Sequence, residues 1–160
     1  MEVDEVDRAI LFVLQEKSRS DLTHSEIADL IGVSQSTVAH RLTRLKESGV
    51  LHHFKPIIDY ERVGLSHHVL FVCSASLGQR RELAERLLEI PKVLNVREFL
   101  STTENLHVEV VASTASEIET AAIQIEDLGV TIDRSEILRR EHCDGLDELG
   151  SDVVDSSMVE

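Results

Sequence analysis

Two closely spaced helix signals, separated by a glycine turn, constrain this chain more than any other feature of its sequence. In THSEIADLIG, Thr23 and Glu26 have the spacing of a capping box, and Gly32 suits the left-handed position that ends a helix. Ser34 can cap a further helix, QSTVAHRLTRLKES, which Gly49 would end. The first helix is then only about two turns long, and a turn of about three residues joins the two. This spacing predicts a helix-turn-helix motif.

The segments on either side extend this motif into a small domain. Residues 4–17 carry an apolar stripe at helical spacing, with acidic residues in the first turn, where the helix dipole favours them. After the motif, VLHHFKPIIDY reads as two short strands bent at Lys55-Pro56, which would form a hairpin or wing. We therefore predict a winged helix-turn-helix domain over residues 1–65.

From His68 onward the hydrophobic pattern changes to alternating strands and helices. HVLFVCSA, VLNVREFLS, LHVEVVA and VTIDRSEIL favour strands, and the helical segments GQRRELAERLLEI and SEIETAAIQIEDLG lie between them. The order βαββαβ is that of a ferredoxin-like domain, predicted over residues 66–142, so the chain is of the α+β class. Helices on one face leave the other face of the sheet unburied, and a second copy of the chain is the obvious partner for it.

Charge is distributed unevenly along the chain. The formal net charge is −14, yet residues 30–58 contain a single acidic residue, Glu47, beside Arg41, Arg44, Lys46 and Lys55. Acidic groups on a surface that meets phosphates would weaken binding, whereas Arg and Lys would strengthen it. The acid-poor window therefore predicts the surface that meets double-stranded DNA.

The direction of the second helix of the motif indicates which residues would contact bases and which would contact phosphates. Its N-terminal polar residues would face base edges in the major groove, and the basic residues farther along would hold phosphates. His52 and His53 on the wing could touch the DNA backbone or the minor groove. The alternative for each of these residues is that it simply lies on a solvated helix surface. For Thr37 the alternative is a role in a local helix cap. The predicted DNA-binding residues are Gln35, Ser36, Thr37, His40, Arg41, Arg44, Lys46 and Lys55.

Residues 4–140 resemble the Lrp/AsnC family of transcriptional regulators. The most specific part is SEIADLIGVSQSTVAHRLTRLKESGVL, followed by IDYERVGL. The resemblance implies dimers formed by pairing of sheets, further assembly into octamers, and a small effector, typically an amino acid, bound between regulatory domains. The implied effector loop is LSTTENLHVEV, with Thr102 and Asn105 where such regulators usually have Gly and Asp. A plain turn is the alternative for this loop, whose candidate effector-binding residues are Ser101, Thr102, Thr103, Glu104 and Asn105.

Two other classes of protein share parts of this plan. Tetrapyrrole (siroheme-type) decarboxylases have the same two domains, and a case for them would use His67, His68, His107 and His142. We predict no enzymatic activity, because His67 and His68 would point to opposite faces of a strand and no catalytic motif is visible. A stand-alone assembly module is the third class, and the intact helix-turn-helix argues against it.

The remaining features predict an ordinary intracellular protein without cofactors. Cys73 and Cys143 form no CxxC pair, so a metal site has little support, and the N-terminus lacks the basic residues of a signal peptide. No apolar run is long enough to cross a membrane, which predicts a cytoplasmic protein. The excess of acids over only four lysines is typical of a salt-rich cytoplasm, such as that of a halophilic archaeon. Residues 143–160 are expected to form an acidic, disordered tail.

Overall fold

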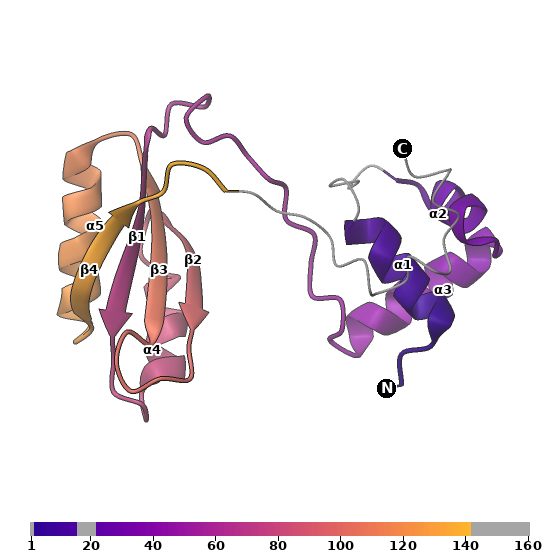
Figure 1. The fold of residues 1–160 in the computed structure, drawn as a ribbon, viewed down its shortest axis with the longest axis horizontal. Helices are drawn as coiled ribbons and strands as arrows, with labels where there is room; N and C mark the ends of the chain where they lie inside the picture. The colour runs from indigo at the N-terminus through magenta and orange to yellow at the C-terminus, as the bar shows by residue number, and fades with distance from the viewer. Residues whose placement is uncertain (1, 16–21, 142–160) are drawn as a thin grey trace. The chain divides into compact units, whose positions relative to one another are not determined.

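The computed structural model describes residues 2–15 and 22–141, and they divide into two compact units between Ile57 and Ile58 (Figure 1). The sequence predicts this boundary after residue 65. Residues 58–65 instead belong to the second unit, in which the Tyr60 ring meets His68 edge-on with ring centroids 5.7 Å apart. The predicted tail at 143–160 and the last two residues of the first predicted helix lie outside the described residues.

Three helices form the first unit: α1 (Glu5–Gln15), α2 (His24–Ile31) and α3 (Gln35–Glu47). The predicted capping box of α2 is confirmed, since the Thr23 hydroxyl accepts from the Glu26 N–H and the Glu26 carboxylate accepts from the Thr23 N–H. Gly32 follows with φ +71°, a left-handed conformation that costs glycine little. The helices enclose an apolar core that includes Ile10, Val13, Ile27, Val38 and Leu45, each at most 1% exposed.

The predicted strands of the wing are wrong. Between Leu51 and Ser66 the described chain contains turns and extended segments but no strand. Pro56 has no N–H to donate to a ladder, and an isolated two-stranded hairpin is only marginally stable in water. Phe54, Ile57 and Ile58 are accordingly exposed. We refer to residues 51–58 as the wing segment.

The second unit is a four-stranded antiparallel sheet with two helices. Its elements are β1 (His67–Ser74), α4 (Arg80–Leu87), β2 (Val93–Glu98), β3 (Leu106–Ala112), α5 (Ala115–Asp127) and β4 (Thr131–Ile137). The strand order is β2-β3-β1-β4 (Figure 1), with every neighbouring pair antiparallel, as a ferredoxin-like domain requires. Both helices pack on one face of the sheet, over a core that contains Phe71, Leu106, Val108 and Val110.

The opposite face of the sheet carries a mixed set of side chains. Because cross-strand partners share a face, the pairs Leu70–Glu109 and Val72–His107 point away from the helices. Glu109 is only 5% exposed there, and its carboxylate lies 2.5 Å from the Nε2 atom of His68. The face is therefore neither wholly apolar nor wholly solvated.

The capping box of α5 predicts a specific pH dependence of stability. The Ser113 hydroxyl and N–H donate to the Glu117 carboxylate, Lys92 adds a further contact, and together they lower the pKa of Glu117 from 4.5 to about 2. Since the pKa is lower in the folded state, the charged carboxylate stabilises the fold above pH 4.5. This contribution is lost as the pH falls from 4.5 towards 2. Thermal unfolding of Glu117→Gln should therefore depend less on pH in this window than unfolding of the unsubstituted protein.

Glu119→Gln, a change at an exposed glutamate of the same helix, is the matched control and should retain the original pH dependence. Equal pH profiles for Glu117→Gln and the unsubstituted protein would contradict this account of the cap.

Candidate nucleic-acid interface

The face of α3 opposite the core presents uncharged polar side chains to solvent. Val38, Leu42 and Leu45 are buried on one side of the helix. Residues displaced from them by about half a turn are exposed, and the helix ends in the exposed Lys46 and Glu47. The exposed uncharged residues are Gln35, Ser36, His40 and Thr43. Glu47 is the one acidic residue of α3, so nearly all of this surface is free of carboxylates.

The N-terminus of α3 is held by a network of hydroxyl groups. The Ser34 hydroxyl accepts from the Thr37 N–H at 3.1 Å, and lies 2.9 Å from the Ser36 hydroxyl and 2.8 Å from the Thr37 hydroxyl. Ser34 is therefore the N-cap that the sequence predicts. Thr37 is only partly exposed and takes part in this cap, whereas Ser36 is exposed in the first turn.

The sequence predicts phosphate contacts for Arg41 and Arg44. In the structure both arginines form ion pairs with carboxylates at the start of α1. Arg44 pairs with Asp7, and Arg41 pairs with Asp4 and also reaches Asp7 at 3.3 Å. The Asp7 side chain is fully buried. Asp4 caps α1 by accepting from the Asp7 N–H at 3.0 Å, and this bond, followed by the Arg41 guanidinium, lowers the pKa of Asp4. We name these four residues the α1–α3 charge cluster.

Sequence reasoning missed the charge cluster. It assigned the acids of the first helix to the helix dipole alone. Asp4 and Asp7 are separated from the two arginines by more than thirty residues, so no local pattern joins them. The sequence did contain one signal for the cluster. Asp7 lies three residues after the capping Asp4, at the edge of the apolar stripe of the helix, where a buried carboxylate would need a cationic partner.

The wing segment adds further basic side chains beside α3. Lys46 of α3 places its ammonium 5.6 Å from the centroid of the Phe54 ring, within the range of a cation–π contact. His52, His53 and Lys55 are all exposed. The structure thus brings Lys46 and Phe54 of the wing segment together, and a role for this surface in binding DNA stays a prediction.

Asn105, predicted as an effector-binding residue, has a structural role in the fold. Its side chain is fully buried, and its Oδ1 atom accepts from the Ala75 N–H at 2.9 Å. Its Nδ2 atom donates to the Ala75 carbonyl at 2.8 Å and to the Ser101 carbonyl at 3.4 Å. An amide occupied on both sides has little capacity left for an effector. An effector role for Asn105 stays a prediction, beside the structural role that these bonds show.

The rest of the loop before β3 lies at the surface. Ser101, Thr102, Thr103 and Glu104 are exposed, and an effector role for them stays a prediction. Glu104 adopts φ +51°, its N–H donates to the Ser74 hydroxyl at 2.8 Å, and its carboxylate pairs with Arg134. These contacts hold a residue other than glycine in a left-handed conformation at the end of the loop.

The residues invoked for catalysis are not brought together as an active site. His67 and His68 are neighbours on β1 and so project to opposite sides of the sheet, His142 lies outside the described residues, and His107 packs its ring on Phe99. In the part of the chain that the structure describes, no cluster of three or more His, Cys, Asp or Glu side chains could hold a metal.

The Cys73 thiol is buried, and burial raises its pKa to about 12.

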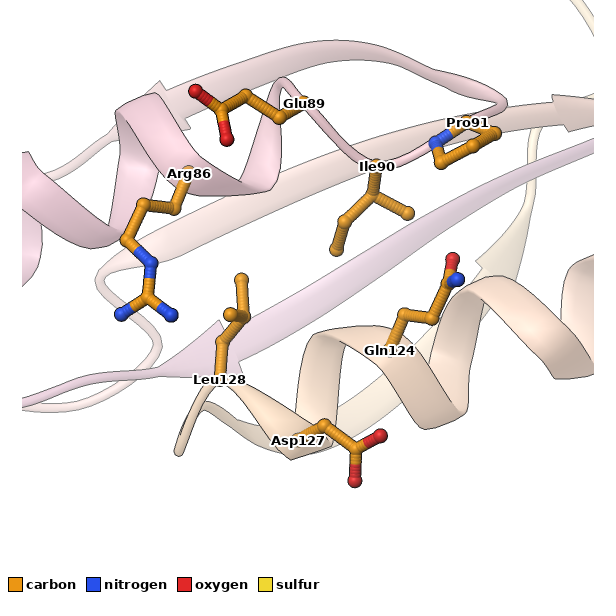
Figure 2. Close-up of a pocket in the computed structure, with 7 residues that line it drawn as sticks. All are labelled: Arg86, Glu89, Ile90, Pro91, Gln124, Asp127 and Leu128. Carbon is orange, nitrogen blue, oxygen red and sulfur yellow. The ribbon is translucent and has the colours of Figure 1, made fainter.

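A shallow pocket of about 330 Å³ lies elsewhere, between the C-terminal ends of α4 and α5 (Figure 2). Ile90 and Leu128 line it, together with the charged Arg86, Glu89 and Asp127.

The helices among the described residues are all too short or too polar to cross a membrane.

Comparisons with known proteins agree with this architecture. Residues 3–52 match the family model described as winged helix-turn-helix DNA-binding. The regulator FL11 of Pyrococcus horikoshii is 33% identical over 96 residues, which span 60% of this chain and 62% of that protein. The uncharacterized HTH-type transcriptional regulator PH0140 of the same organism is 31% identical over 119 residues, 74% of this chain and 73% of that protein.

Solved structures share this fold over most of the chain. The leucine response regulatory protein LrpA of Mycobacterium tuberculosis superposes with a TM-score of 0.72 at 24% identity, covering 88% of this chain and 99% of that chain. The transcriptional regulator NMB0573 of Neisseria meningitidis, solved as a complex with L-Met, superposes with a TM-score of 0.69 at 21% identity. The match covers 91% of this chain and 96% of that chain.

The three-helix unit and the ferredoxin-like unit that follows it have the fold of two-domain regulators such as LrpA. The match to the winged helix-turn-helix model and the similarity to PH0140 show that the chain belongs to the family of HTH-type transcriptional regulators. The relatives are regulators by name, and the decarboxylase alternative receives no support from them.

The buried amide of Asn105 predicts a stability effect that its exposed neighbours lack. Asn105→Ala would leave the N–H and C=O groups of Ala75 without partners inside the fold, so the free energy of unfolding should fall by about 2 kcal/mol. Thr102→Ala, in the exposed part of the same loop, should change it by less than about 0.5 kcal/mol. Urea unfolding of both variants tests this, and equal stabilities would argue against the structural role.

Proposed function

We propose that the protein is a sequence-specific DNA-binding transcriptional regulator that works as a dimer or a larger homo-oligomer in the cytoplasm. The observation that carries the proposal is the exposed, carboxylate-poor face of α3, whose first two turns present Gln35, Ser36 and His40. In a helix-turn-helix these positions enter the major groove, and short polar side chains there can hydrogen-bond to base edges. Lys46 and Lys55 supply the positive charge that phosphates require. Membership of a regulator family supports the same function.

A second copy of the chain would cover the face of the sheet opposite α4 and α5. Leu70 and Val72 lie on that face, and a sheet buried on one side only gains stability by packing the other. The symmetry of such a dimer would present two copies of α3 to one duplex. Octamers are the further assembly that we propose from the family resemblance.

A free amino acid is the small-molecule effector that we propose for the second unit. The similar fold of NMB0573 was solved with L-Met, and the loop residues Ser101 to Glu104 are exposed here. The proposal excludes Asn105, whose amide is already occupied. Measuring heat on titration of single amino acids into the protein tests it, and no heat with any of the twenty would remove the effector from the proposal.

The dimer predicts the symmetry of its target. Mapping the protein across the genome, with and without candidate amino acids, followed by footprinting of occupied sites, should show operators with two-fold symmetry. The half-sites should lie about one helical turn apart, or a multiple of it, because a dimer presents two related helices. Footprints that are consistently asymmetric would argue against binding of the operator by a symmetric dimer.

The acidic composition predicts tolerance of salt. If the protein works in a salt-rich cytoplasm, release of counterions contributes little, and base contacts with DNA shape must supply most of the affinity. Gel-shift binding to an operator found by footprinting should then persist in about 1 M KCl. Binding that disappears well below this concentration would contradict the saline interpretation without affecting the regulator assignment.

A further inference from the structure

The two arginines of α3, Arg41 and Arg44, form ion pairs with acidic residues that cannot be broken without a cost in free energy. Asp7 is fully buried and receives Arg44 directly and Arg41 at 3.3 Å. A buried carboxylate is tolerated only while cationic or hydrogen-bonding partners surround it. Withdrawing either guanidinium towards DNA would strip that compensation, so the gain from a phosphate contact would be offset by the cost of leaving the buried Asp7 without that partner.

The charge cluster also fixes the rotation of α3 about its axis. Arg41 directly follows His40, and Arg44 directly follows Thr43, so each arginine is about 100° around the helix from an exposed polar neighbour. With both arginines held against the first turn of α1, His40 and Thr43 must face solvent. Asp4 is part of the same arrangement, because it caps α1 and pairs with Arg41.

We infer that Arg41 and Arg44 are positioning residues that orient α3, and that Thr43 joins Gln35, Ser36 and His40 in the surface that reads bases. This inference rests on the proposed function and refines the sorting of contacts within it. Phosphate contacts then fall to Lys46 and to Lys55 of the wing segment. Neither lysine takes part in any of the ion pairs found among the described residues.

The salt dependence of DNA binding separates positioning from phosphate contact. Each phosphate contact contributes about 0.9 to the slope of log affinity against log salt concentration. Fluorescence anisotropy of an operator duplex identified by footprinting, titrated across KCl concentrations, measures this slope. Lys46→Ala should lower it by about 0.9 per subunit, while Arg44→Ala should leave it unchanged.

Loss of orientation should appear in base preference instead. Arg44→Ala is expected to reduce the ratio of operator to random-duplex affinity by about tenfold, and Thr43→Ala to change the preferred base at one position of each half-site. Lys46→Ala should weaken binding to both duplexes about equally. A fall in slope for Arg44→Ala as large as that for Lys46→Ala would overturn the inference.

A milder pair of substitutions covers the case in which Arg44→Ala fails to fold. Asp4→Asn keeps a good helix cap while removing the charge that pairs with Arg41, and Glu5→Gln removes an equal charge from the exposed neighbouring position. If the charge cluster orients α3, Asp4→Asn should reduce the ratio of operator to random-duplex affinity, whereas Glu5→Gln should leave that ratio unchanged. Equal ratios for the two variants would overturn the inference.

Failure of the proposed function would look different. If the unsubstituted protein bound neither the sites mapped in the genome nor a random duplex at any KCl concentration, the regulator proposal would fall and the inference with it. Measurable binding with the wrong pattern of slopes would overturn the inference alone.

Discussion

The buried carboxylate of Asp7 is the constraint on which the DNA-binding unit depends. It holds two guanidinium groups of α3 against the first turn of α1, and so supports the orientation that the buried apolar side of α3 also favours. Burying a charge costs free energy that hydrophobic residues of the same size would not, so such a pair is better understood as a specifier of geometry than as a source of stability. The apolar core and the ion pairs together hold the three helices in this arrangement.

The ferredoxin-like unit uses a neutral group for a comparable purpose. Asn105 joins the end of the loop before β3 to the segment that follows β1, through paired bonds to the backbone of Ala75. In both units, therefore, one buried polar side chain ties together two segments that are distant in sequence. The difference lies in charge: the Asn105 amide needs no counterion, whereas Asp7 needs two guanidinium groups.

Local signals predicted most of the architecture, and long-range contacts account for what was missed. The capping box at Thr23, the cap at Ser34 and the alternation of Leu106, Val108 and Val110 each depend on residues a few positions apart, and the structure has all three. The ion pairs of Asp7 and the bonds of Asn105 join residues about thirty positions apart or more, which periodicity does not reveal. The wing strands were predicted from composition alone, but a strand needs a partner and burial that this exposed segment lacks.

The charged margin of the sheet has a consequence for how copies of this chain can aggregate. β4 is an outer strand, and Asp133, Arg134 and Glu136 occupy its centre. Charges on an outer strand penalise addition of another strand in register, which is the step that leads to open-ended fibrils. Growth by continuous hydrogen bonding is thereby disfavoured, and association through the flat side of the sheet, which closes after a limited number of subunits, is the safer route.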